Sequence, residues 1–93
     1  MAKIIVKFYS LWNLYLNKKE VPLEVDNLDE AMEKLEILFG DQLRKQLKSK
    51  KLQFENFKNS STVLVNGVSL RNIKNRNLKD GDVLHIFPPI AGG

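Results

Sequence analysis

The sequence contains no cysteine and only one histidine, His85. Disulfides, thiolate metal sites and cysteine nucleophiles are therefore excluded together, and one histidine cannot build a zinc site. The sequence also lacks a Gly-x-x-x-x-Gly-Lys-Ser/Thr loop, so it offers no nucleotide site of this kind. We expect no metal and no cofactor bound by this chain, which carries few groups for catalysis of its own.

Long hydrophobic runs are also missing, and none approaches the roughly 20 residues that a membrane-spanning helix needs. The start, Met1-Ala2-Lys3, leads directly into strand-like sequence and leaves no room for a signal peptide, so we expect a cytoplasmic protein. The 93 residues are enough for one domain, 1–93, because two would each be too small for an adequate core. With 43% hydrophobic and 28% charged residues, the composition is typical of a globular protein.

The net charge is +4, carried by twelve lysines and only three arginines among the basic residues. Lys45, Lys48, Lys50 and Lys51 stand close together and suit an acidic surface or nucleic acid as a partner. The shortage of arginine is a poor match to base-reading chemistry. A solvated surface is the favoured interpretation, and nucleic acid is not expected as a partner.

The first part of the chain predicts two strands. Ala2–Ser10 alternates between apolar and polar residues, and residues 21–25 alternate in the same way. Pro22 cannot donate a ladder hydrogen bond, so the second strand should lie at an edge of the sheet. Between them, Leu11–Leu16 is apolar without a clean period, which fits an irregular turn or a short helical turn.

A helix is expected from Asn27, which can cap it with Glu30 as its capping-box partner. The apolar stripe of this helix comprises Leu28, Ala31, Met32, Leu35, Leu38 and Phe39. Gly40 stands where a C-cap glycine belongs, and Asp41 can begin a second short helical stretch.

The second half predicts three further strands. Residues 48–61 form a lysine-rich insertion, expected to be a surface loop of which part is an extra strand or is packed. Asn66-Gly67 predicts a type I′ turn joining strands 62–65 and 68–70. Residues 71–79 are expected to form a crossing loop before the last strand, Val83–Phe87, in which Leu84 and Ile86 share one face.

This order of elements predicts an α+β fold of the β-grasp (ubiquitin-like) type, a mixed sheet packed on one main helix. The last strand should lie centrally, beside the first. Pro88-Pro89 must end that strand and favours a stiff segment that points the rest of the chain away from the body. Gly92 and Gly93 have no side chain and can pass through a narrow channel. We therefore expect a tail over residues 88–93 that is stiff at the two prolines and flexible at its Gly-Gly end.

The stretch from Asp80 to Gly93, and most specifically Phe87-Pro88-Pro89-Ile90-Ala91-Gly92-Gly93, resembles the C-terminal signature of the MoaD family. This family comprises the small, sulfur-carrier subunits of molybdopterin synthase, which are ubiquitin-like and ThiS-like. The hairpin around Asn66-Gly67 and the spacing of the first strand and helix match the same pattern. The lysine-rich insertion, 48–61, departs from it.

The resemblance implies that Gly93 is adenylated by an activating enzyme similar to MoeB, which uses ATP, and is then converted to a thiocarboxylate. Ala91 and Gly92 would accompany it into the active site of a larger subunit similar to MoaE. There the sulfur would pass to a pterin precursor of the molybdenum or tungsten cofactor, so the chain is a substrate and a non-catalytic subunit.

Phe87, Pro88, Pro89 and Ile90 are the predicted partner contacts because they form an apolar surface beside the tail. The alternative for Phe87 is that it completes the core, and the alternative for His85, also a candidate contact, is a packing role. Other open functions are a ubiquitin-like protein modifier and a sulfur carrier for thiamine or tRNA thiolation. The choice between molybdenum and tungsten, the role of the insertion and the oligomeric state are not set by the sequence.

Overall fold

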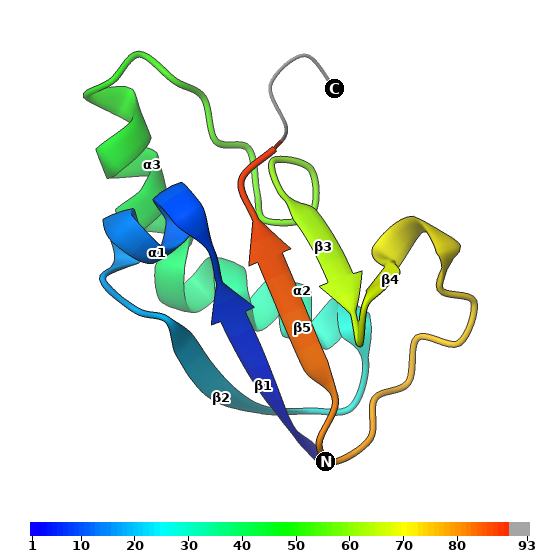
Figure 1. Ribbon diagram of the computed structural model, residues 1–93. Helices are drawn as coiled ribbons and strands as arrows, with labels where there is room; N and C mark the ends of the chain where they lie inside the picture. Colours follow the sequence, from blue (N-terminus) through cyan, green and yellow to red (C-terminus); the bar gives the residue numbers. More distant parts are fainter. Residues whose placement is uncertain (90–93) are drawn as a thin grey trace.

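A mixed five-stranded sheet lies on a long helical segment in the computed structural model, which describes residues 1–89 (Figure 1). The strands follow the spatial order β2-β1-β5-β3-β4. Their bounds are Ala2–Phe8 for β1, Glu20–Val25 for β2, Thr62–Val65 for β3, Val68–Ser69 for β4 and Val83–Phe87 for β5. The α+β, β-grasp architecture predicted from the sequence is confirmed.

The last strand, β5, occupies the centre of the sheet as predicted. It runs parallel to β1, with Val6 opposite Leu84, and antiparallel to β3, with Val63 opposite Ile86. Leu84 and Ile86 are fully buried because their face of the strand lies against the helical layer. The end of β5 is therefore held from both sides by hydrogen-bonded neighbours.

The prediction that the proline-containing strand lies at an edge is also confirmed. Pro22 pairs with Ile5 of β1, and β2 has no other neighbour in the sheet. Lys34 Nζ donates a hydrogen bond to the carbonyl oxygen of Glu24 at 2.8 Å. The proline in β2 and the lysine from α2 that bonds to its backbone reduce the capacity of this edge to pair with another chain.

The long helix begins where the sequence predicted but does not end there. The Oδ1 atom of Asn27 accepts a hydrogen bond from the backbone N–H of Glu30 at 2.9 Å, which confirms the cap. Three helical pieces then follow without a gap: α2 (Leu28–Leu35), a π-helical turn η1 (Glu36–Gly40) and α3 (Asp41–Lys48). The predicted C-cap at Gly40 is wrong, because Gly40 has a right-handed helical φ of −58°.

The π-helical turn also corrects the predicted apolar stripe. Leu38 is 56% exposed, whereas Leu35, Phe39 and Leu43 are buried. A π-helical turn contains more residues than an α-helical turn, so side chains four residues apart stay on the inward face of the helix. Leu38 is consequently turned out to solvent.

Residues 49–61 form a packed loop and not an extra strand, which were the two alternatives left open for part of the insertion. Phe54 and Phe57 are buried, with their ring centroids 5.1 Å apart, and Leu52 is 52% exposed. Phe57 also lies 6.2 Å from the ring of Phe8 in β1. The loop thus completes the core between the helical layer and the sheet.

The remaining local predictions hold, with one exception. Residues 11–16 form a short helix, α1 (Ser10–Leu16). Asn66 and Gly67 have φ values of 50° and 89°, as a type I′ turn requires. Leu70 is not part of a strand, because it begins a 3-10 turn, η2 (Leu70–Asn72).

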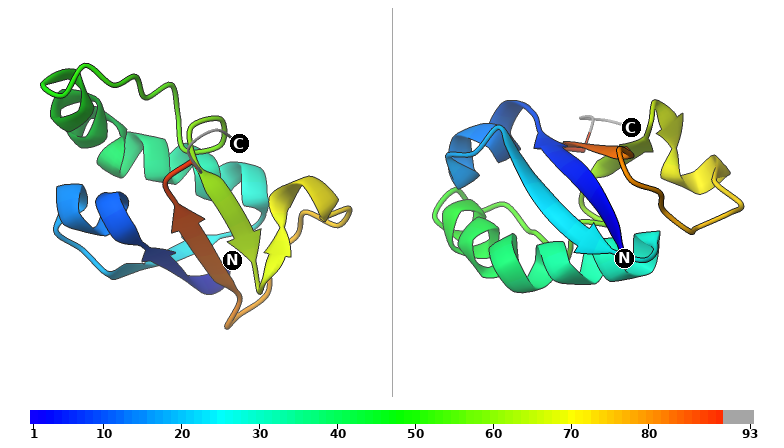
Figure 2. Two further views of the ribbon diagram at one scale, coloured as in Figure 1. Left: turned by 45° about the horizontal axis from the view of Figure 1, so that its top comes forward. Right: turned by 90° about the horizontal axis from the view of Figure 1, so that it is seen from below.

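The helical segment covers one face of the sheet, and within residues 1–89 no helix covers the other (Figure 2). The two faces differ accordingly, since the inward residues of β1 and β5 are buried and the outward residues of β5 are half-buried. In the same range, no helix combines the length and hydrophobicity that crossing a bilayer requires.

Candidate functional site

The central strand carries the chain to one end of the sheet and stops there. Thr62 opposite Phe87 is the last residue pair between β3 and β5, and the strand ends before Pro88 and Pro89. This confirms that the double proline terminates sheet pairing, since proline has no N–H to donate. The chain leaves the sheet at the end where α1 and α3 also lie (Figure 1).

An apolar groove of about 530 Å³ lies beside this exit. Its walls come from the start of α1, the outer face of β3 and the end of β5 with the two prolines. The lining residues are Ser10, Leu11, Thr62, Leu64, Phe87, Pro88 and Pro89. The first described residues of the predicted tail therefore form part of a surface that can receive an apolar side chain.

Tyr9, which directly follows β1, holds the end of β5 in place. Its ring stacks on Phe87, with a centroid separation of 4.3 Å and an interplanar angle of 9°. Its hydroxyl is joined by a hydrogen bond of 2.7 Å to Nδ1 of His85. Its backbone N–H donates to the carbonyl oxygen of Ile86 at 3.1 Å. Two side chains of β5 and its backbone are thus held by one residue.

The groove wall formed by α1 begins with a strained residue. Ser10 has a φ of 51°, a left-handed conformation that is uncommon for residues other than glycine. This conformation turns the chain sharply from β1 into α1. A hydrogen bond then joins α1 to the loop 49–61, because the indole Nε1 of Trp12 donates to Oγ of Ser61 at 2.8 Å.

The structure brings four of the predicted contact residues together. Phe87 and His85 lie on the outer face of β5 and are half-buried, so Phe87 does not belong to the buried core. Pro88 and Pro89 continue from them along the groove. Their contact with a partner stays a prediction. The other predicted site residues, Ile90, Ala91, Gly92 and Gly93, lie outside the described residues.

The residues that other elements contribute to the groove were not predicted from the sequence. Tyr9 lies in the alternating stretch Ala2–Ser10, and an aromatic residue on the outward face of that predicted strand was the available signal. Leu11 lies in the stretch whose conformation the sequence left open. Nothing local in the sequence indicated that Thr62 and Leu64 lie beside Phe87, because that depends on the pairing of β3 with β5.

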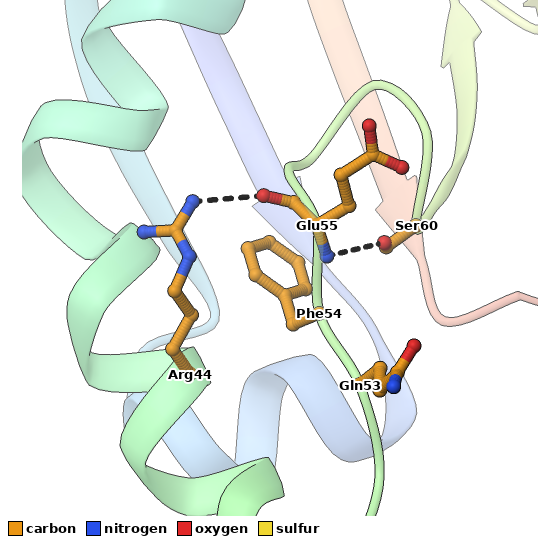
Figure 3. A pocket seen from close by; sticks show the side chains of 5 residues that line it. All are labelled: Arg44, Gln53, Phe54, Glu55 and Ser60. Atoms are coloured by element: carbon orange, nitrogen blue, oxygen red, sulfur yellow. Dashed lines mark hydrogen bonds between the residues drawn. The ribbon is translucent and has the colours of Figure 1, made fainter.

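A second hollow, of about 630 Å³, lies between α3 and the loop 49–61 (Figure 3). It is lined by Arg44, Gln53, Phe54, Glu55 and Ser60. The hydrogen bonds that Arg44 donates to Glu36, and to a lesser extent to Asp41, raise the pKa of Arg44. Its Nη2 also donates to the carbonyl oxygen of Glu55 at 2.8 Å. The guanidinium of Arg44 is therefore already bound by groups of the protein itself. For this reason the hollow is poorly suited to bind an anion.

Clusters of potential metal ligands were sought among the described residues. Residues 1–89 contain no group of three or more histidine, aspartate or glutamate side chains arranged to hold an ion.

Comparison with known proteins identifies the family. The model of the ThiS family matches residues 10–93. The chain belongs to the ThiS family. The resemblance found in the tail motif is thus confirmed at the level of the family, and the match includes α1, the groove and the predicted tail. A search of curated proteins found no match.

Solved structures similar to this ThiS-family chain share its fold. The small archaeal modifier protein SAMP1 from Methanosarcina acetivorans has a TM-score of 0.73 at 24% identity, with 100% of this chain and 98% of that chain covered. A putative molybdopterin converting factor subunit 1 from Pyrococcus furiosus has a TM-score of 0.64 at 22% identity, covering 97% and 100%.

A third structure was solved as a complex. It contains subunits 1 and 2 of the molybdopterin-converting factor from Helicobacter pylori, and the matched chain has a TM-score of 0.62 at 21% identity, covering 98% and 99%. At these identities the likenesses show the fold, which is that of ubiquitin-like modifiers and of molybdopterin converting factor subunits.

Proposed function

We propose that this ThiS-family protein is a sulfur carrier in the biosynthesis of the molybdenum or tungsten cofactor. The observation that carries the proposal is the family match, which runs from the start of α1 through the groove and the double proline to Gly93. The central strand β5 supplies the rigid base from which the tail would reach into another protein. That the chain ends in the carboxylate of Gly93 is part of the proposal.

Gly93 would be the reacting residue, and its carboxylate must first be activated. A terminal carboxylate is ionised at neutral pH and does not react with sulfur nucleophiles. In an activating enzyme, a carboxylate oxygen attacks the α-phosphorus of ATP, and pyrophosphate leaves. A persulfide then displaces AMP from the acyl-adenylate and forms an acyl disulfide. Reduction of its S–S bond by a thiol leaves the thiocarboxylate.

The groove would hold the large synthase subunit while the thiocarboxylate reacts. Phe87, Pro88 and Pro89 would contact that subunit, and Gly92 and Gly93 would enter its active site. There the thiocarboxylate would transfer its sulfur to the pterin precursor. The complex of subunits 1 and 2 among the structural relatives supports this arrangement.

The intact mass of protein isolated from its native host tests the proposal. We expect a fraction whose mass exceeds that of the free acid by the difference between a sulfur and an oxygen atom, located at Gly93. A variant with one tryptophan appended after Gly93 is the control, and it should lack this fraction. If the free acid is the sole form, even in cells that actively make the cofactor, the proposal is refuted.

A second candidate function is attachment to other proteins as a ubiquitin-like modifier. The SAMP1 structures among the relatives favour it, because their names describe modifier proteins. The same activated Gly93 would then form an isopeptide bond with a lysine of another protein. Digestion of host proteins and detection of lysines that carry the C-terminal residues of this chain would distinguish it from a carrier that is never attached.

A further inference from the structure

The net positive charge of the protein is concentrated in one segment. Residues 42–58 contain six basic side chains and one acidic side chain, a net charge of +5 in a chain whose total is +4. The positive and negative charges of the remaining residues therefore nearly cancel. Within the segment, Lys45, Lys48, Lys50 and Lys51 are exposed at the end of α3 and just beyond it, and they define what we call the basic cluster.

The basic cluster lies at the end of the molecule from which the tail leaves. Figure 1 shows the end of α3 and the following loop on the same side as the end of β5. The loop begins at these lysines and leads to Thr62, which pairs with Phe87 beside the groove. The positive charge and the groove are thus parts of one end of the protein.

These lysines have few roles within the described structure. Among residues 1–89 the ion pairs involve Met1, Arg44 and Arg76, and none involves the basic cluster. Lys45 and Lys48 complement the dipole of α3, since they lie in its last turn. Lys50 lies 5.6 Å from the ring centroid of Tyr15. Lys51 lies beyond the helix and has no such role.

The chemistry of this surface favours an acidic protein over nucleic acid. No aromatic side chain among the described residues is exposed, so the surface offers no platform on which bases could stack. The arginine in the segment, Arg44, is already bound to Glu36, Asp41 and the backbone of Glu55. The surface is thus a set of mobile point charges, which attract an acidic patch without selecting base edges.

We propose that the basic cluster docks on an acidic surface of the enzyme that activates Gly93, and that it speeds the encounter of the two proteins. This inference rests on the proposed function. An activating enzyme must bind and release the carrier in every cycle, and exposed charges act on the association rate more than on the lifetime of a complex. The proposed function assigns the apolar groove to the large subunit, which leaves the basic cluster for the activating enzyme.

Two triple variants with the same net charge test the inference. Lys45, Lys48 and Lys51 are changed to glutamine in one, and Lys3, Lys74 and Lys79 in the other. Both sets are exposed, and the second belongs to the segments at the start of β1 and before β5. Lys50 stays in place because it packs on Tyr15. Thermal unfolding checks that both variants are folded.

The assay is ATP–pyrophosphate exchange by the adenylyltransferase of the native host, measured at two salt concentrations. Screening of charges is weak at about 20 mM salt and nearly complete at about 0.5 M salt. At low salt we expect kcat/KM of the Lys45/Lys48/Lys51 variant to fall about tenfold with kcat unchanged, as electrostatic steering predicts. The Lys3/Lys74/Lys79 variant should lose less than about twofold, and high salt should remove the difference.

The outcomes separate the two proposals. If wild-type protein supports no exchange, the proposed function is refuted and the docking inference falls with it. If exchange occurs and the two triple variants behave alike at low salt, the inference alone is overturned. It is also overturned if the Lys45/Lys48/Lys51 variant is activated normally and instead loses binding to total host tRNA in a filter assay.

Discussion

Replacing Gly40 by alanine tests why a glycine stands in the middle of the long helix. The backbone of Gly40 is right-handed helical, with φ −58° and ψ −46°, and does not need glycine for its conformation. A Cβ added there would collide with Oε2 of Glu36 and press on Nη1 of Arg44. These two side chains form an ion pair with each other. The glycine therefore leaves space for the ion pair.

Two opposing effects set the magnitude. Alanine is favoured over glycine in a helix interior by about 0.8–1.0 kcal/mol. Against this, the carboxylate of Glu36 must move away from Arg44, a partly exposed pair worth about 0.2–1 kcal/mol. It must also give up the N–H of Phe57, which it accepts at 3.2 Å. A hydrogen bond of this kind contributes about 0.5–1.5 kcal/mol. We expect Gly40→Ala to destabilise the protein by up to about 1.7 kcal/mol.

The sign should reverse when Glu36 is absent. In a Glu36→Ala background the added Cβ meets no carboxylate, so Gly40→Ala should stabilise the protein by up to about 1 kcal/mol. Urea unfolding of the four proteins gives the coupling energy, expected to be about 1–2 kcal/mol. Gly67→Ala is the control, because Gly67 has a φ of +89° and nothing within 4 Å of its added Cβ.

Gly67→Ala should destabilise both backgrounds equally, since its cost is conformational strain. If Gly40→Ala also destabilises both backgrounds to the same extent, the steric explanation is refuted and a conformational demand at Gly40 must be sought.

Two further predictions concern the site and the opposite end of the helical layer. Tyr9→Phe keeps the stack on Phe87 and should lower the free energy of unfolding by about 0.5–1.5 kcal/mol, whereas Tyr9→Ala should lose a further 0.5–1.5 kcal/mol or more, both measured by urea unfolding. Equal losses would contradict a role for the stack. Arg76, chiefly through its hydrogen bonds, lowers the pKa of Asp29 below the ordinary value. The ion pair therefore stabilises the protein fully at pH values above the ordinary pKa. This stabilisation is lost as the pH falls through the lowered pKa of the folded state. The stability lost in Asp29→Asn should accordingly be largest near neutral pH and shrink in acid, and a loss independent of pH would exclude this linkage.

Features that depend on neighbouring residues could be predicted from the sequence. Asn66-Gly67 makes a type I′ turn because each residue tolerates positive φ, whatever surrounds it. Asn27 caps the helix through an N–H three residues away. Pro88 ends β5 because its own ring removes the donor. In each case the physical cause lies within a few residues of the feature.

Features that depend on distant residues were missed or left open. The helix continues through Gly40 because the apolar side chains of η1 and α3 pack on the core, and this packing overrides a local stop signal. Phe54 and Phe57 lie in a polar, lysine-rich stretch. Their burial depends on distant partners, because Phe57 packs beside Phe8 and Phe54 packs beside Trp12. The π-helical turn that exposes Leu38 likewise has no local signature.

The sequence alone determined the class of fold, the central place of the last strand and the point at which the chain leaves the sheet. Alternation, caps, turn residues and prolines act through the local backbone, so they can be interpreted without coordinates. The tertiary structure alone decided that Tyr9 holds Phe87, that α1 and β3 form the other walls of the groove, and that the basic cluster lies at the same end as the tail. These relations join residues far apart in the chain, and only sheet pairing and core packing bring them together.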